Sequence, residues 1–329
     1  MTDIDDVEAA YRSAADAGDI TSMANLGILL AERNDIEEAE IWYLRAAEAG
    51  STTAMTNFGL MLEEYEREEE AEVWYRRAAD AGDTEGMFYL GHLMWLNENL
   101  EEAETWWRRS AQGGDTDGSI HLSSLLIKRG DLDEAATWLR KAADHGSESA
   151  MHHLGRLLMK RGNHEEAEIW YRRATDLGST YAMYDLGVLL KERGDLDEAV
   201  ALWRHASESD PSQYRRPGHT GAMHALGTLM KERGDLDEAE SWFRRAADHG
   251  YKRAMADLGA LQLERGNLDE AEVWLRRAVK IGYRPAMTRL GKLLEERGQF
   301  DEAKTWYRRA AGIVAVPPGT PTGQYHVAH

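Results

Sequence analysis

Residues 150–178 read AMHHLGRLLMKRGNHEEAEIWYRRATDLG, and this stretch decides the fold. Its first half carries apolar residues three and four positions apart, the spacing of one helix face: Met151, Leu154, Leu157 and Leu158. Its second half repeats that spacing with small and aromatic residues: Ala167, Trp170, Tyr171 and Ala174. The pattern predicts two amphipathic helices joined by a short turn, with Gly155 allowing a close approach.

The turn between the two predicted helices reads Arg161-Gly162-Asn163. Glycine suits the left-handed backbone that ends a helix, and Asn163 with Glu166 matches a capping box at the start of the next one. We expect the same box at four other helix starts: Asp35/Glu38, Asp131/Glu134, Asp195/Glu198 and Asp235/Glu238. Acidic first turns and arginine-rich last turns match the helix dipole, so we interpret these charges as helix stabilisation.

The stretch is one of nine copies, marked by a Leu-Gly pair or a close variant of it. The pairs are Leu26-Gly27, Phe58-Gly59, Leu90-Gly91, Leu122-Ser123, Leu154-Gly155, Leu186-Gly187, Leu226-Gly227, Leu258-Gly259 and Leu290-Gly291. Successive pairs are 32 residues apart, except for one step of 40, and a Trp follows fifteen positions after the glycine in eight copies. Two landmarks at constant spacing predict an all-α repeat solenoid of antiparallel helix pairs, in which each copy packs on its neighbours.

The repeats and their interruption define five segments. We expect an N-terminal capping helix at 1–18, repeats one to six at 19–209, an inserted loop or hinge at 210–221, repeats seven to nine at 222–312, and an irregular tail at 313–329. Two prolines and two glycines argue against helix in the insertion. It is basic and aromatic, and its candidate contact residues are Tyr214, Arg215, Arg216 and His219. Whether it is a contact site, a hinge or a neutral loop stays open.

Composition narrows the classes of partner and chemistry. The net charge is −20, which repels phosphate backbones, so nucleic acid is not the expected partner. The chain has no cysteine, which removes disulfides, thiol catalysis and cysteine zinc sites. No signal peptide and no membrane-spanning run of about 18 or more apolar residues is visible, so we expect a cytoplasmic protein without cofactor or membrane partner.

The repeat resembles the tetratricopeptide repeat and its relative, the Sel-one-like (Sel1) repeat. Leu154-Gly155, Ala167 and Tyr171 sit at tetratricopeptide spacing, whereas the string from Trp170 to Ala174 looks more like the Sel1 form. The chain lacks the Sel1 insertion between the helices and is two residues shorter per repeat than the tetratricopeptide form. The resemblance implies a right-handed superhelix, of bacterial origin, whose concave wall is lined by the first helix of each repeat and binds peptides or proteins.

Residues of the first helices that the packing pattern does not need are the candidate binding residues. In the tetratricopeptide family an Asn just before Leu-Gly often grips a peptide main chain, and Asn25 and Asn57 match that usage. Repeats three to seven add large or polar side chains at neighbouring slots: Phe88, Tyr89, His92, Trp95, His121, His152, His153, Arg156, Tyr184, Asp185, Lys191 and His224. Aromatic and arginine side chains are typical of interface centres.

Alternatives to a binding wall remain for these residues. Phe88 and Trp95 also suit simple packing between first helices. A metal site is not expected, because the adjacent His152 and His153 point about 100° apart on a helix and no HExxH pattern is present. The leading function is a non-catalytic interaction scaffold, and the alternatives are a peptide-sensing regulator, a self-associating scaffold or, least favoured, an enzyme. Repeats two and three lack the turn glycine, which predicts less stable turns.

Overall fold

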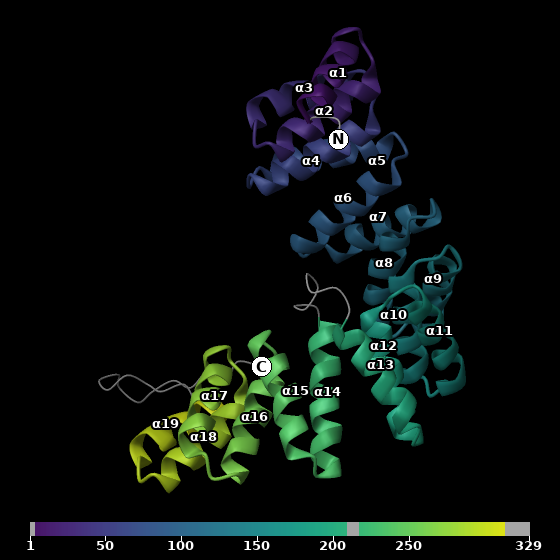
Figure 1. Ribbon diagram of the computed structural model, residues 1–329. Helices are drawn as coiled ribbons and strands as arrows, with labels where there is room; N and C mark the ends of the chain where they lie inside the picture. Colours follow the sequence, from purple (N-terminus) through teal and green to yellow (C-terminus); the bar gives the residue numbers. More distant parts are fainter. Residues whose placement is uncertain (1–3, 209–216, 313–329) are drawn as a thin grey trace, which may run out of the picture. The chain divides into compact units, whose positions relative to one another are not determined.

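The computed structural model describes residues 4–208 and 217–312, and these ranges form nineteen α-helices and no strand (Figure 1). Contacts divide the chain into two compact parts, Met1–Leu177 and Gly178–His329, called here the N-terminal and C-terminal parts. Each is considered by itself. Within the described ranges, no helix combines the length and the apolar character needed to cross a membrane.

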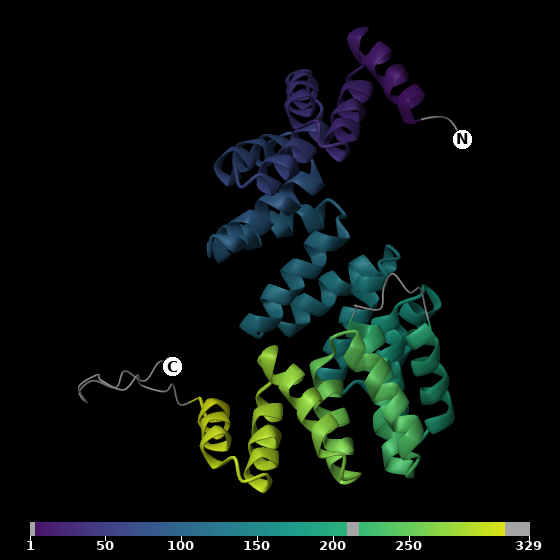
Figure 2. The same ribbon diagram turned by 60° about the vertical axis from the view of Figure 1, so that its left-hand side comes forward.

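The helices of the N-terminal part follow one another at short intervals. They are α1 (Ile4–Asp16), α2 (Ile20–Glu32), α3 (Ile36–Glu48), α4 (Thr52–Glu64), α5 (Glu68–Asp80), α6 (Thr84–Leu96), α7 (Leu100–Gln112), α8 (Thr116–Arg129), α9 (Leu132–Asp144), α10 (Glu148–Lys160) and α11 (His164–Asp176). Each packs on the next along the chain, which Figure 2 shows from the purple α1 to the teal helices. Even-numbered helices are the first helices of repeats one to five, and α1 stands before them as the expected cap.

The C-terminal part continues the same alternation. Its helices are α12 (Thr180–Arg193), α13 (Leu196–Glu208), α14 (Pro217–Arg233), α15 (Leu236–Asp248), α16 (Lys252–Glu264), α17 (Leu268–Lys280), α18 (Arg284–Glu296) and α19 (Phe300–Ala310). They make four helix pairs, which with the five of the N-terminal part give the nine predicted repeats. The prediction of an all-α solenoid of helix pairs is confirmed.

The glycine of each Leu-Gly pair locks the two helices of a repeat together. A Cβ atom added at Gly155 would lie 2.5 Å from Cε1 of Tyr171, which is too close for two carbons, so the helices can meet there only through glycine. The equivalent pairs place a ring sixteen residues after the glycine: Gly27/Tyr43, Gly59/Tyr75, Gly91/Trp107, Gly187/Trp203, Gly227/Phe243 and Gly291/Tyr307. In repeat six the ring is Trp203 itself, next to the slot that the other tryptophans fill.

Turns end in the left-handed conformation, as predicted. Gly162 has φ 79°, and the corresponding residues of repeats one to three are Asn34 at φ 65°, Glu66 at φ 58° and Glu98 at φ 60°. Side chains are strained in this region, at a cost of about 1 kcal/mol. Repeat one therefore shares the irregular turn that the sequence indicated for repeats two and three.

The predicted capping boxes are wrong at four of their five positions. Asp35, Asp131, Asn163 and Asp235 each begin a second helix but make no side-chain capping bond. Caps form instead on first helices, where Asp19 Oδ2 accepts from Ser22 N at 2.8 Å and Ser51 Oγ accepts from Ala54 N at 3.1 Å. The fifth predicted cap, Asp195, accepts a hydrogen bond from Arg193.

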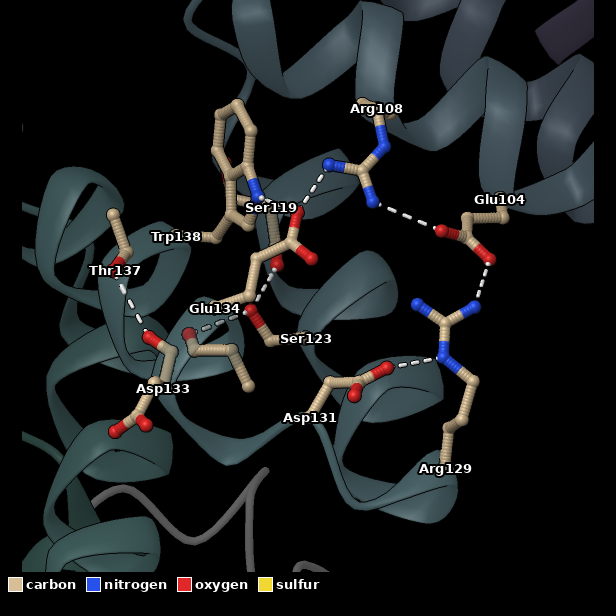
Figure 3. A network of polar contacts seen from close by, with 11 residues as sticks. Glu104, Arg108, Ser119, Ser123, Arg129, Asp131, Asp133, Glu134, Thr137 and Trp138 are labelled. Atoms are coloured by element: carbon tan, nitrogen blue, oxygen red, sulfur yellow. Dashed lines mark hydrogen bonds and ion pairs between the residues drawn. The ribbon is translucent and has the colours of Figure 1, made fainter.

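The glutamates expected in those boxes link neighbouring repeats instead. In Figure 3, Arg108 of α7 binds Glu134 of α9, and its other nitrogen lies 2.9 Å from Glu104. Trp138 Nε1 donates to the same Glu134 at 3.3 Å, and Arg129 binds Glu104 at 2.8 Å. The Arg–Glu link recurs between successive helices of this type as Arg12–Glu38, Arg76–Glu102, Arg140–Glu166, Arg204–Glu238, Arg244–Glu270 and Arg276–Glu302.

These links explain the charge pattern without a ligand. Each is partly exposed, and such an ion pair contributes about 0–1 kcal/mol to stability. Several in a row fix which glutamate faces which arginine, so they set the register between repeats more than the total stability. The charges therefore stabilise structure, as the sequence indicated, but between helices rather than at helix ends.

The insertion is shorter than predicted, because α14 begins at Pro217 rather than after Gly221. Proline is tolerated in the first turn of a helix, where its missing N–H needs no partner. Gly218 then packs on α12, since a Cβ there would lie 2.7 Å from the backbone carbon of Thr180. Helices α13 and α14, on either side of the insertion, pack together inside the C-terminal part. The other segment boundaries stay predictions.

Candidate functional site

A pocket opens between the first helices of repeats three and four. Its volume is about 290 Å³, and its lining comes from α6, α7 and α8: His92, Trp95, Trp107, His121, Ser124, Leu125 and Lys128. Three of the residues singled out from the sequence, His92, Trp95 and His121, are among them. The name α6–α8 pocket is used for this site below.

Aromatic rings surround His121. Its ring centroid lies 5.0 Å from that of Phe88, 5.2 Å from that of Trp107 and 6.3 Å from that of His92. His92 in turn lies 5.8 Å from Trp95. Burial lowers the pKa of His92, and His121 lowers it further, against an opposing effect of Glu63. At neutral pH the pocket is therefore a largely uncharged aromatic surface with one cation, Lys128, at its border.

The same ring contacts show that Tyr89 is tied to the core. Its ring stacks on the fully buried Tyr75 at a centroid distance of 5.6 Å, and Phe88 lies against Tyr89 at 5.1 Å. Phe88 and Tyr89 are half-buried, whereas Trp95 is 39% exposed. Packing and ligand-facing roles are thus combined in this repeat, and Trp95 is the most accessible of the three.

Repeat five separates its two adjacent histidines. His152 is only 7% exposed and its ring lies 6.0 Å from Tyr171 of α11, so it belongs to the packing within the repeat. Its place in the predicted groove is a correction: a residue directly before the Leu-Gly neighbour turns toward the second helix. His153 is half-buried, with Nδ1 2.8 Å from the carbonyl of Ser149, and Arg156 is exposed.

The two asparagines lie on α2 and α4 at equivalent slots. Both are half-buried. Asn57 lines an open cavity of about 430 Å³ between these helices, together with Tyr43, Tyr65 and Glu32 among others. This is where the family resemblance implies a grip on a peptide main chain, and that role stays a prediction.

In the C-terminal part the predicted groove residues pair with each other. Lys191 Nζ lies 2.7 Å from Glu232 of the next first helix. His224 Nε2 and Arg289 Nη1 both lie 2.8 Å from carboxylate oxygens of Asp257.

The carboxylate at the centre of that chain is ionised. Burial alone would raise the pKa of Asp257, but the hydrogen bonds from His224 and Arg289 outweigh it, so the pKa is lowered. The rings of His224 and Tyr251 lie 5.4 Å apart, and the ring of Tyr184 lies against Gly221. Asp185 is half-buried on α12. The polar groups here are largely satisfied within the fold.

The predicted loop contacts fall into two groups. Tyr214, Arg215 and Arg216 lie outside the described residues. His219 lies in the first turn of α14 and is fully buried, so it is not a surface contact, which corrects the prediction. Proline at the start of the helix brings His219 into the helical core instead of a loop. Over the stretches that the structure describes, no three His, Asp or Glu side chains gather as a metal-binding group.

Sequence reasoning missed Lys128, which borders the α6–α8 pocket. A comparison of the same slot in all nine repeats would have found it, because most repeats carry Glu there. The slot was overlooked because lysine near a helix end is ordinarily explained by the helix dipole.

Nine helix pairs with glycine–aromatic locks, presenting varied side chains on their first helices, define a helical-repeat solenoid. Residues 20–49, 120–182, 179–249, 252–277 and 285–313 match the tetratricopeptide repeat, and residues 59–83 and 84–115 match the Sel1 repeat. The chain belongs to the tetratricopeptide- and Sel1-repeat proteins. The resemblance inferred from the repeat is confirmed.

Solved structures of such proteins share the fold. The Sel1 repeat protein from Oxalobacter formigenes is 26% identical with a TM-score of 0.64, covering 87% of this chain and 90% of that one. The protein c5321, a protective antigen of uropathogenic Escherichia coli with an SLR fold, is 24% identical with a TM-score of 0.62, over 94% and 73%. Yeast Tom70 is 13% identical with a TM-score of 0.54, over 95% and 89%. A search of curated proteins found no match to this chain.

Proposed function

We propose that this chain is a non-catalytic scaffold that binds a peptide or protein partner through the side chains of its first helices. The observation that carries the proposal is the α6–α8 pocket, in which aromatic and histidine residues that the repeat pattern does not require face a common space. Tetratricopeptide and Sel1 repeats generally mediate protein–protein interactions, which supports the same class of function. The fold alone does not identify the partner.

A protein partner fits the charge of the chain better than a nucleic acid does. The net charge of −20 opposes a phosphate backbone, and the aromatic pocket suits apolar side chains. A second copy of the chain is the alternative protein partner. A cytoplasmic location and the absence of a cofactor or membrane partner stay predictions.

The test compares partner capture by two double variants of the full chain. Trp95→Ala with Arg156→Ala removes two exposed side chains of the first helices. Ile41→Ala with Val73→Ala removes two side chains of second helices that are each 55% exposed, and serves as the matched control. Tyr89 and His153 are left intact, because their packing contacts make a loss of binding ambiguous.

We expect the Trp95/Arg156 variant to lose captured partners that the Ile41/Val73 variant and the wild type retain, with all three equally helical. Removal of an interface aromatic or arginine typically costs about 2 kcal/mol or more, which is over tenfold in affinity. Equal capture by the two variants would exclude the first helices as the binding surface.

A further inference from the structure

One slot of the first helices changes its charge in the middle of the chain. It lies five residues after the glycine position of each Leu-Gly pair, in the last turn of the helix. Six repeats have glutamate in it: Glu32, Glu64, Glu192, Glu232, Glu264 and Glu296. The three successive repeats three, four and five have Leu96, Lys128 and Lys160 instead. All three lie in the N-terminal part.

The helix dipole does not explain this reversal. Lysine in a last turn is favourable and glutamate is unfavourable, so the dipole alone would favour lysine in every repeat. The slot holds glutamate in most of them. A lysine of the preceding repeat neutralises two of these glutamates in the C-terminal part, Lys191 with Glu232 at 2.7 Å and Lys231 with Glu264 at 2.6 Å.

The cations of repeats four and five have no such partner. Within residues 4–208 and 217–312, Lys128, Arg156 and Lys160 make no hydrogen bond or ion pair, and all three are exposed. The arginines that follow the two lysines are bound, Arg129 to Glu104 at 2.8 Å and Arg161 to Asp133 at 2.6 Å. The structure thus supplies carboxylates to nearby cations but leaves these three without one.

An apolar surface adjoins the three cations. Lys128 lines the α6–α8 pocket beside Trp95, and the neighbouring Leu96 and Leu100 are 49% and 48% exposed. The pocket of about 290 Å³ is at the lower end of ligand sites, which are typically about 300–1,000 Å³. Its size suits one anchoring side chain better than a whole cofactor.

We propose that the α6–α8 pocket with Lys128, Arg156 and Lys160 binds an acidic peptide segment of a partner protein. One aromatic or large aliphatic side chain of the segment occupies the pocket, and its carboxylates lie against the three cations. This assignment rests on the proposed scaffold function and names the class of partner. Charge-assisted pairs to lysine and arginine give specificity and speed association, while the apolar anchor supplies most of the affinity.

The chemistry of other occupants matches this surface less well. The tail of the chain, residues 313–329, contains no Asp or Glu, so it offers nothing to the cations. A nucleic acid would bring phosphates, but also the repulsion of a protein with a net charge of −20. A second copy of the chain remains as an outcome of the experiment.

The experiment selects short random displayed peptides on three forms of the immobilised full chain. The first is the wild type. The second carries Lys128→Glu and Lys160→Glu, which installs the residue that six other repeats hold in this slot and so preserves the fold. The third carries Lys292→Glu and Lys304→Glu, an equal change of charge at exposed lysines of α18 and α19. Circular dichroism and thermal melting confirm that all three fold alike.

We expect wild type and the Lys292/Lys304 variant to enrich peptides that combine Asp or Glu with a nearby aromatic or large aliphatic residue. A synthetic, labelled copy of the most enriched peptide should bind the Lys128/Lys160 variant about tenfold more weakly or worse, and should weaken with salt. Trp95→Ala should weaken it comparably.

Enriched peptides without an acidic bias, or with equal affinity for the Lys128/Lys160 variant, would overturn the acidic-segment proposal while leaving the scaffold function standing. Failure to enrich any peptide on the wild type would count against both. A mass in light scattering that doubles with concentration, and does so only when Lys128 and Lys160 are present, would assign the surface to a second copy and also overturn the proposal.

Discussion

At the scale of single residues, the backbone of three turns carries avoidable strain. Glu66 and Glu98 occupy the left-handed region that Gly162 and most other repeats fill with glycine. Replacing either with glycine should raise the free energy of unfolding by up to about 1 kcal/mol, because only the side chain is strained there. Denaturant melts of Glu66→Gly and Glu98→Gly would measure the gain. Gly162→Ala is the opposite change and should lose stability, so no gain in the first pair would contradict the strain.

Protonation of one buried imidazole should also affect stability. Burial lowers the pKa of His153 below 6.5, and nearby positive or titratable groups lower it further, against a hydrogen bond to the Ser149 carbonyl that raises it. These groups are His152, Arg156 and His121. Between the lowered pKa and 6.5 the unfolded chain binds more protons than the folded chain, so stability falls as pH drops through that window and then levels off.

His153→Gln should therefore lose less of its melting temperature than wild type when the pH falls from about 7.5 to about 5.5. His164 is exposed at the start of α11, and His164→Gln is the matched control that should follow the wild-type curve. Superimposable pH profiles for the two variants would show that His153 is not buried at a cost.

At the scale of the helix, α14 differs from every other first helix by starting early. Gly218 in its first turn faces the backbone of Thr180, whereas Gly221 faces the ring of Tyr184 at 3.3 Å. Both substitutions to alanine gain about 1 kcal/mol of helix propensity. Gly218→Ala should nevertheless destabilise by about 1–3 kcal/mol, because backbone cannot give way as a ring can. Thermal melts should order Gly221→Ala above Gly218→Ala, and the reverse order would refute this contact.

The same scale shows what the sequence could and could not predict. Helix number, pairing and the Gly155–Tyr171 contact follow from periodicity, because each repeat must bury the same face against the same neighbour. The capping boxes failed because Glu38 and Glu134 have a better partner in an arginine 26 residues earlier, which only the stacking of repeats brings near. His152 failed for the opposite reason, since one helical step separates a groove residue from a packing residue.

At the scale of the whole molecule, the eight residues beyond the 32-residue period should be dispensable. Removal of residues 209–216 would place Gly218 where Gly178 ends the preceding repeat at φ 92°. The shortened chain should keep its helicity and melt within a few degrees of wild type, with the extra first turn of α14 converted to an ordinary turn. A large loss of melting temperature would assign the insertion a structural role.

Net charge leads to a further expectation for the whole molecule. A chain with a charge of −20 should not retain a labelled single-stranded RNA or DNA oligonucleotide at physiological ionic strength. Electrophoretic mobility shifts at several salt concentrations would check this. Saturable binding that weakens with salt would indicate a basic surface strong enough to overcome the overall charge, and Lys128→Glu with Lys160→Glu would locate it.

The binding surface was only partly predictable at this scale. Phe88, His92, Trp95 and His121 stood out as large side chains in slots that vary, and the structure brings them to one place. Lys128 did not stand out, because its meaning lies in the contrast with the glutamates of other repeats. The pairing of Lys191 with Glu232 could not be foreseen either, since it depends on how far successive first helices are offset.

The arginine links between second helices also have a mechanical consequence. Each link joins a repeat to the next one and to no other, so a force applied along the chain meets a series of similar junctions. Under such a load one repeat would detach while the links beyond it stay closed, and each release would add about 110 Å of extended chain. A partner held between other repeats would stay bound while the molecule lengthens, which makes the solenoid a tether that yields in steps.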